Sequence, residues 1–147
     1  MILKTHLCAP IGEATRREIA QNLELLKADN AYWISAQLNS GKQPPCCTKA
    51  MGIEYRPPQG AEKLTPEQEF FAAPFLIARG RGACGDIHAY DAAALEVLFG
   101  IQTQILVPAQ GRTSYHVVML TPAGPMDRTK NWNTRKCQCH LLHALRT

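Results

Sequence analysis

The chain has 147 residues, 46% of them hydrophobic and 19% charged, and a formal net charge of +4 at pH 7, which suits one domain over residues 1–147. Its sixteen Lys and Arg residues are scattered and its aromatic residues follow apolar patterns, so the composition argues against a nucleic-acid-binding surface. No apolar run approaches the ~20 residues of a membrane-spanning helix and residues 1–9 do not form a secretory signal, so we expect neither a membrane span nor export by a signal peptide.

The first forty residues predict one strand followed by helix. Residues 1–8 have the pattern of an edge strand. Apolar side chains recur at helical spacing over residues 13–27 and again over residues 31–38, which predicts two amphipathic helices or one bent helix. The pattern ends near residues 39–41, whose Asn, Ser and Gly favour a helix stop.

An irregular connection and a short helix are predicted next. Prolines and glycines over residues 43–60 predict a loop, within which residues 51–56 favour a short extended piece. Thr65 and Pro66 are the residue types that begin a helix, so we expect a helix from Thr65 that ends before Pro74.

The centre of the chain is a glycine-rich turn over residues 79–85 that leads into an alanine-rich helix. We expect this helix over residues 86–99, with a stop at Gly100. Its predicted inward face includes Ile87, Ala94, Leu95 and Leu98. Two strands follow, over residues 102–108 and 114–121, and a short loop joins them as an antiparallel hairpin.

Cys84 stands where the glycine-rich turn meets this helix, and that position favours chemistry at its sulfur. Unpaired amide N–H groups at a helix N-terminus carry partial positive charge, which favours the nucleophilic thiolate. A nucleophilic cysteine also needs a base and a group that orients the base. His116 in the second predicted strand and Asp127 after the next turn can supply them, in the order of a papain-like Cys-His-Asp triad.

These residues carry a family resemblance. Gly80, Gly82 and Cys84 form a glycine-x-glycine-x-cysteine motif, which is followed by an acidic residue and an apolar helix. His116-Val and then Asp127 come later in the chain. This order of residues resembles the transglutaminase-like cysteine-peptidase superfamily. The resemblance implies a papain-like α+β fold, with a Cys-bearing helix packed on an antiparallel sheet. Residue by residue, it implies Cys84 as nucleophile, His116 as base and Asp127 as the group that orients the base.

A narrower resemblance is to the small transglutaminase-like proteins of tailed bacteriophages and prophages. It extends over residues 32–58 and 79–129, and the first of these stretches includes the aromatic and basic pair Tyr55-Arg56 after a proline-rich segment. The resemblance implies one transglutaminase-like cysteine peptidase domain with a core over residues 32–129.

The function implied is that of a phage-encoded, thiol-dependent peptidase or amidase acting on a protein or peptide substrate without a cofactor, with hydrolysis favoured over acyl transfer. The alternative is a structural component of a tailed-phage virion, in the neck or tail, that uses the same fold to dock on other phage structural proteins. Either reading implies synthesis in the host cytoplasm, with the virion as a second location.

The chain departs from the family pattern beside the cysteine and the aspartate. Ala83 and Gly85 replace acidic residues that usually flank the cysteine, and we expect Gly85 to weaken the first helical turn. Arg128 stands where the family often has proline. Of the remaining polar residues near the motif, we assign Asp86 to complementing the helix dipole and His88 to the surface or to packing.

The other cysteines suggest an alternative kind of site, one that binds a metal ion. We expect all six cysteines of the chain to be reduced thiols, because a domain of this length does not need a disulfide framework. Their spacing differs from the usual two-residue gaps of metal-binding pairs, so metal binding is the alternative rather than the expectation. The candidate ligands of that alternative are Cys46, Cys47, Cys137 and Cys139.

Overall fold

The computed structural model describes residues 1–6, 11–56, 67–111 and 114–137, and over these residues the chain is a mixed α+β structure. Its helices are α1 (Glu13–Asn39), α2 (Ala73–Arg79) and α3 (Cys84–Phe99), with a 3₁₀ turn, η1, at Lys49–Met51. Its strands are β1 (Ile2–His6), β2 (Glu54–Tyr55), β3 (Glu67–Phe71), β4 (Arg81–Gly82), β5 (Gln104–Leu106), β6 (Val118–Thr121) and β7 (Gly124–Met126). No helix in this described part is both long and apolar enough to cross a membrane.

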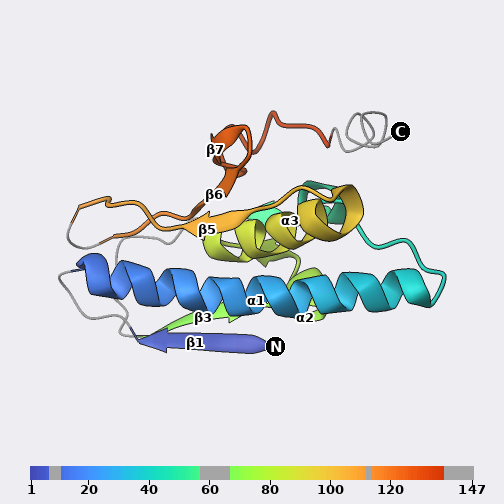
Figure 1. Ribbon diagram of the computed structural model, residues 1–147, viewed down its shortest axis with the longest axis horizontal. Coiled ribbons are helices and arrows are strands. Elements are labelled where there is room, and N and C mark those ends of the chain that lie inside the picture. Colours follow the sequence, from blue (N-terminus) through green and yellow to red (C-terminus); the bar gives the residue numbers. More distant parts are fainter. Residues whose placement is uncertain (7–10, 57–66, 112–113, 138–147) are drawn as a thin grey trace.

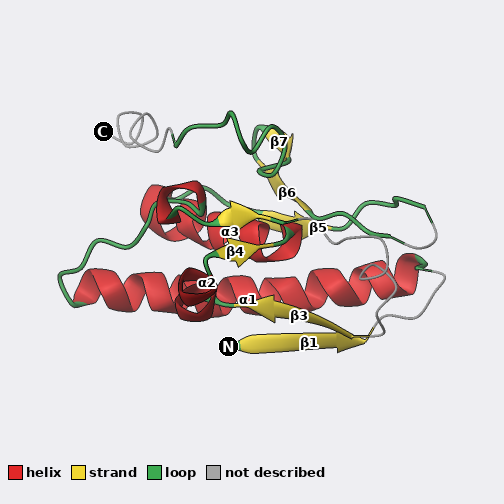
Figure 2. Cartoon of the chain, turned by 180° about the vertical axis from the view of Figure 1, so that it is seen from behind, coloured by secondary structure: helices red, strands yellow, loops and turns green. Residues whose placement is uncertain are grey.

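Helix α1 crosses the molecule between two layers (Figure 1 and Figure 2). On one side lies the antiparallel ribbon of β1 and β3, and on the other lie α3 and the three-stranded sheet β5–β6–β7. The sequence leaves open whether this region holds two helices or one bent helix, and the structure has one continuous helix from Glu13 to Asn39.

The apolar stripe of α1 and nearly all of α3 form the core. The fully buried apolar residues of α1 share one helix face and are Ile19, Leu23, Leu26 and Ile34. Helix α3 is buried on every side from Cys84 to Leu95, and it ends at Gly100 as predicted. Because a helix that is buried all round has packing on each face, α3 is a rigid support for the residue at its N-terminus.

Residues 67–71 form a strand where the sequence predicts a helix. Strand β3 pairs antiparallel with β1 along its whole length. Phe70 is buried while Glu69 is exposed, which is the alternation of a strand. The prediction was wrong because helix-start signals act locally, whereas the strand forms with a partner at the beginning of the chain. The predicted helix start at residues 65–66 lies outside the described residues.

Gly80 ends α2 and turns the chain toward α3. Its φ of 74° lies in the left-handed region, which glycine adopts without strain. The following strand, β4, pairs parallel with β2, so that Tyr55 lies opposite Gly82, two residues before Cys84. The predicted extended piece around Tyr55 is therefore held beside the turn that carries Cys84.

The antiparallel hairpin predicted after α3 is present, with shorter strands than expected. Strand β5 pairs with β6, which pairs in turn with β7, and α3 contacts both β5 and β6. His116 therefore precedes β6 instead of lying within a strand, and Asp127 directly follows β7.

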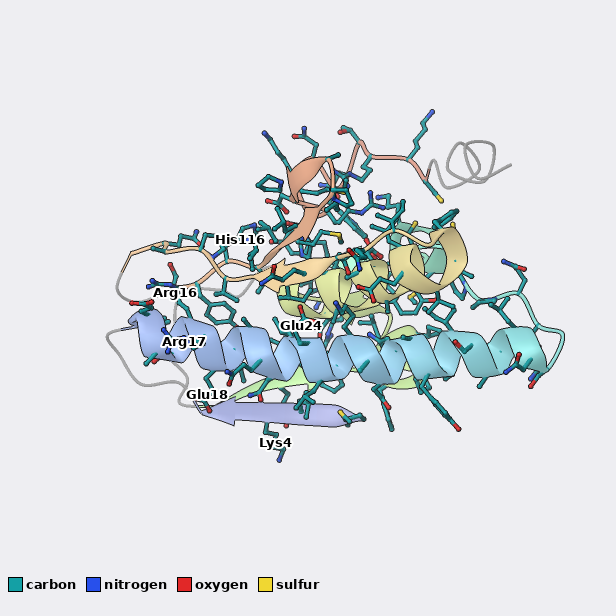
Figure 3. The ribbon with its side chains drawn as sticks, viewed as in Figure 1. Lys4, Arg16, Arg17, Glu18, Glu24 and His116 are labelled. Atoms are coloured by element: carbon teal, nitrogen blue, oxygen red, sulfur yellow. The ribbon has the colours of Figure 1, made fainter. Side chains whose placement is uncertain are left out.

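A charged contact joins α1, α3 and the start of β5. Lys27 Nζ lies 2.8 Å from Glu24 Oε2 and 2.9 Å from Glu96 Oε2, and it donates to the Thr103 carbonyl at 3.0 Å. Glu24, on the side of α1 that faces β5 (Figure 3), also accepts the N–H of Ile105 at 2.7 Å. Burial lowers the pKa of Lys27, but the two glutamates outweigh it and raise that pKa overall.

Candidate functional site

Cys84 is the first residue of α3, and the first turn of this helix is tied to its surroundings by Asp86. The Asp86 carboxylate accepts the N–H of Ala83 at 3.0 Å and the N–H of Phe71, at the end of β3, at 2.8 Å. Burial raises the pKa of Asp86 to about 6, although these hydrogen bonds and the charge of Arg79 act in the opposite direction. Asp86 therefore fixes the position of the helix start as well as complementing its dipole.

The Cys84 side chain is only 2% exposed. Burial raises the pKa of its thiol to about 12, although the backbone N–H groups of Gly85 and Val117 favour the thiolate. The helix N-terminus does not overcome this burial, so the thiol is the resting form at neutral pH. A reaction at this sulfur requires both a base and the displacement of the side chains that cover it.

His116 and Asp127 are in contact. The His116 Nε2 atom lies 2.8 Å from Asp127 Oδ2, while Asp127 Oδ1 accepts the backbone N–H and the hydroxyl of Thr129 at 2.9 and 2.7 Å. Burial alone would raise the pKa of Asp127, but the hydrogen bonds from Thr129 and His116 lower it to about 2. Asp127 is thus a carboxylate at neutral pH, so His116 Nε2 donates to it, and Nδ1 is the ring nitrogen left to take up a proton.

Cys84 lies beside the segment that carries His116. Val117, whose N–H favours the Cys84 thiolate, directly follows His116, and the charge of Asp127 also acts on the Cys84 thiol. Figure 3 shows His116 where the chain enters β6. Among the described residues, no hydrogen bond joins the Cys84 sulfur to the His116 ring. The contact between His116 and Asp127 is therefore assembled, whereas Cys84 contacts the neighbouring residue, Val117, through its backbone.

His88 is a member of this site that sequence reasoning missed. It is fully buried, and its Nε2 accepts the N–H of Arg128 at 2.9 Å, so its Nδ1 carries the proton and donates to the Cys84 carbonyl at 2.8 Å. Burial lowers its pKa and keeps the ring neutral. Full burial excludes the surface position and agrees with packing. Sequence reasoning missed the two ring hydrogen bonds, and the spacing of four residues from Cys84 is the signal that could have found the one to Cys84.

The same contact explains Arg128, which stands where the resembled family often has proline. A proline has no N–H and could not donate to His88. The Arg128 side chain lies 3.1 Å, Nε to Oδ2, from Asp91 of α3, and Arg135 Nη2 donates to the carbonyl of Asp127 at 3.2 Å. The segment that carries Asp127 is thus held to α3 by several polar contacts.

Three of the four cysteines considered as metal ligands also converge. The sulfur atoms of Cys46, Cys47 and Cys137 all lie within 4.8 Å of one another. Cys139, the fourth candidate, lies outside the described residues. Three thiols in one cluster can bind a soft metal ion.

Comparisons of the chain with protein-family models, with curated proteins and with solved structures found no match. The family resemblance drawn from the sequence therefore stays a prediction.

Proposed function

We propose that the chain is a thiol-dependent peptidase or amidase with a papain-like, transglutaminase-like core, encoded by a tailed phage. Cys84 is the nucleophile of this proposal, His116 the base and Asp127 the group that orients it. The observation that carries the proposal is the 2.8 Å contact between His116 Nε2 and the ionised Asp127, beside the helix N-terminus that carries Cys84.

The proposed reaction begins when His116 Nδ1 takes the proton of the Cys84 thiol and the sulfur attacks the carbonyl carbon of an amide. The C–N bond then breaks, and the leaving amine takes the proton from His116. Water, deprotonated by the same nitrogen, attacks the thioester, and the C–S bond breaks to release a carboxylic acid and restore the thiol. The Cys84 backbone N–H, at the start of α3, is the donor we assign to the developing oxyanion.

A second function, a docking module of a tailed-phage virion with an idle site, has its own support. Cys84 is 2% exposed, burial raises the pKa of its thiol to about 12, and no hydrogen bond links it to His116 within the described residues. For this function, Cys84→Ala should leave particle assembly and infection normal. If Cys84→Ala instead abolishes infection or protein processing, the enzyme is favoured.

The deciding experiment is the pH dependence of alkylation by iodoacetamide, mapped on each cysteine by peptide mass spectrometry. Cys47 is a matched internal reference, because it is also 2% exposed and burial likewise raises the pKa of its thiol to about 12. For the enzyme, we expect Cys84 at pH 7 to react at least ~10-fold faster than Cys47 in the presence of a chelator. That advantage should disappear in His116→Ala.

Equal alkylation rates of Cys84 and Cys47 in the wild type would remove the enzyme proposal and leave the docking function. A fast Cys84 whose rate does not depend on His116 would remove the assigned base. The circular dichroism of His116→Ala should match that of the wild type, which shows that a lost rate is not a lost fold.

A further inference from the structure

The three-cysteine cluster lies apart from the roles proposed for Cys84, His116 and Asp127. Cys46 and Cys47 belong to the connection between α1 and η1, whereas Cys137 lies some ninety residues later in the chain. Cys46 Sγ lies 3.3 Å and Cys47 Sγ 3.5 Å from Cys137 Sγ. Both distances are longer than the ~2.05 Å of a disulfide bond, so neither pair is covalently joined.

The spacing of the sulfurs is that of ligands around a single ion. Thiolates at about 2.3 Å from a tetrahedral Zn²⁺ lie about 3.8 Å from one another. The two pairs that include Cys137, at 3.3 Å and 3.5 Å, fall a few tenths of an ångström short of this value, and all three sulfur atoms lie within 4.8 Å of one another. Small movements of these side chains would therefore let all three sulfur atoms reach one ion.

The surroundings of the cluster suit a structural metal ion. Cys47 is buried, and Cys46 and Cys137 are partly buried, so the ion would be shielded from solvent. Three thiolates and Zn²⁺ carry one net negative charge, and the positive charge of Arg135 acts on Cys47. Asp91, the negative group that faces Cys47, is already paired with the Arg128 side chain.

We propose that Cys46, Cys47 and Cys137 bind one Zn²⁺ ion, which joins the connection after α1 to the segment after β7. Soft thiolate ligands favour Zn²⁺ over the hard cations Mg²⁺ and Ca²⁺. On binding, the three thiols lose their protons to solvent, each sulfur forms a bond to the metal, and a water molecule fills the fourth tetrahedral position. Cys139, outside the described residues, is not part of the proposed site.

The position of the ion gives it a structural consequence. The segment from Asp127 to Cys137 is already held to η1, which directly follows this connection, by the Lys49 side chain, which donates to the Trp132 carbonyl at 2.7 Å. Trp132 also lies against Tyr55, with ring centroids 6.2 Å apart. Bonds from the metal ion to the three cysteines would add a further link between these two parts of the chain and would hold the segment that begins at Asp127.

The test uses the full chain produced in medium supplied with zinc. We expect one Zn²⁺ per chain in non-denaturing mass spectrometry, a melting temperature that falls by about 5–10 °C on chelation, and a thiolate-to-metal absorption band when Co²⁺ replaces zinc. Cys46, Cys47 and Cys137 should resist iodoacetamide until the chelator is added. These readouts use the wild-type protein and do not depend on any variant folding.

Variants then assign the ligands. Cys46→Ser, Cys47→Ser and Cys137→Ser should each weaken zinc binding about 100-fold or more, whereas the matched control Cys84→Ser, also at a buried cysteine, should bind one zinc as the wild type does. A folded wild type that takes up neither zinc nor cobalt would overturn the proposal. So would iron in place of zinc, a disulfide between Cys46 and Cys137 in the unreduced protein, or equal loss of zinc in Cys84→Ser.

Discussion

The two carboxylate oxygens of Asp127 accept hydrogen bonds from different partners, one from the imidazole of His116 and the other from Thr129. Oδ2 accepts from His116, and Oδ1 accepts twice from Thr129. Because all three donors favour the charged form, the pKa of Asp127 falls to about 2 despite the opposite effect of burial. Asp127 therefore stays charged, and keeps its hydrogen bond from His116 Nε2, well below neutral pH.

The charge of Asp127 is the part of this arrangement that a single substitution can remove. In Asp127→Asn the side chain keeps its size but loses the charge-assisted hydrogen bond to His116, which is worth about 1.5–3 kcal/mol. We expect the alkylation rate of Cys84 at pH 7 to fall about 10- to 100-fold. Asp29→Asn is the matched control, since it removes the same charge at the surface of α1, where Asp29 lies near the chain N-terminus. Equal rates in the two variants would contradict the orienting role.

Helix α3 presents three polar residues to the segment after β7. Cys84, His88 and Asp91 follow one another at spacings of four and three residues, so they share one face of the helix. His88 bonds the N–H of Arg128 and Asp91 pairs with the Arg128 side chain. One buried helix face thus positions both Cys84, the proposed nucleophile, and the segment that carries Asp127.

The close packing of α3 reverses what the sequence suggests about Gly85. A helix-interior glycine is expected to weaken the helix by about 1 kcal/mol relative to alanine. A Cβ atom at Gly85, however, would lie 2.8 Å from the ring of Phe70 and 3.3 Å from Leu23. We therefore expect Gly85→Ala to destabilise the fold by about 1–3 kcal/mol, measured by urea unfolding.

The clash with Phe70 can be tested by making room for the added methyl group. Phe70→Leu shortens the ring side chain and will itself cost stability. In that background, Gly85→Ala should be close to neutral or stabilising, so the two substitutions should show a favourable coupling of about 1 kcal/mol or more in a double-mutant cycle. A Gly85→Ala variant that is more stable than the wild type would show instead that helix propensity decides at this position.

At the scale of the whole molecule, three buried or half-buried groups make the stability of the fold depend on pH, and they do not all act in the same direction. Burial lowers the pKa of His88 below its unfolded value of about 6.5, so its contribution is lost as the pH falls below that value. Burial raises the pKa of Asp86 to about 6, so stability is gained as the pH falls from about 6 to about 4. Asp127, with a pKa of about 2, loses its contribution as the pH falls from about 4 to about 2.

These three directions predict how the melting temperature depends on pH. A chelator is present throughout, so that release of a metal ion does not affect the measurement. The melting temperature of the wild type should change little between pH 6 and pH 4 and fall below pH 4. Asp86→Asn should lose melting temperature already from pH 6.5 downward, whereas His88→Gln should gain between pH 6.5 and pH 4. Circular dichroism at pH intervals of 0.5 measures all three, and identical profiles would contradict the assigned ionisations.

The features predicted correctly from sequence are those that depend on near neighbours in the chain. The end of α3 at its glycine stop, the buried stripe of α1 and the antiparallel pairing after α3 follow from periodicity and from turn residues. The contact between His116 and Asp127 also agrees with the sequence pattern that paired them, and each of the two residues lies next to a short strand.

Tertiary structure alone decided the rest, because those contacts join residues far apart in sequence. Strand β3 forms only against β1, and Gly85 is needed only because Phe70 packs on it. His88 becomes a bridge only when Arg128 folds back onto α3, and Cys137 reaches Cys46 across ninety-one residues. The sequence by itself determined which chemical groups the protein has, and the packing around α3 determined which of them meet and which are buried.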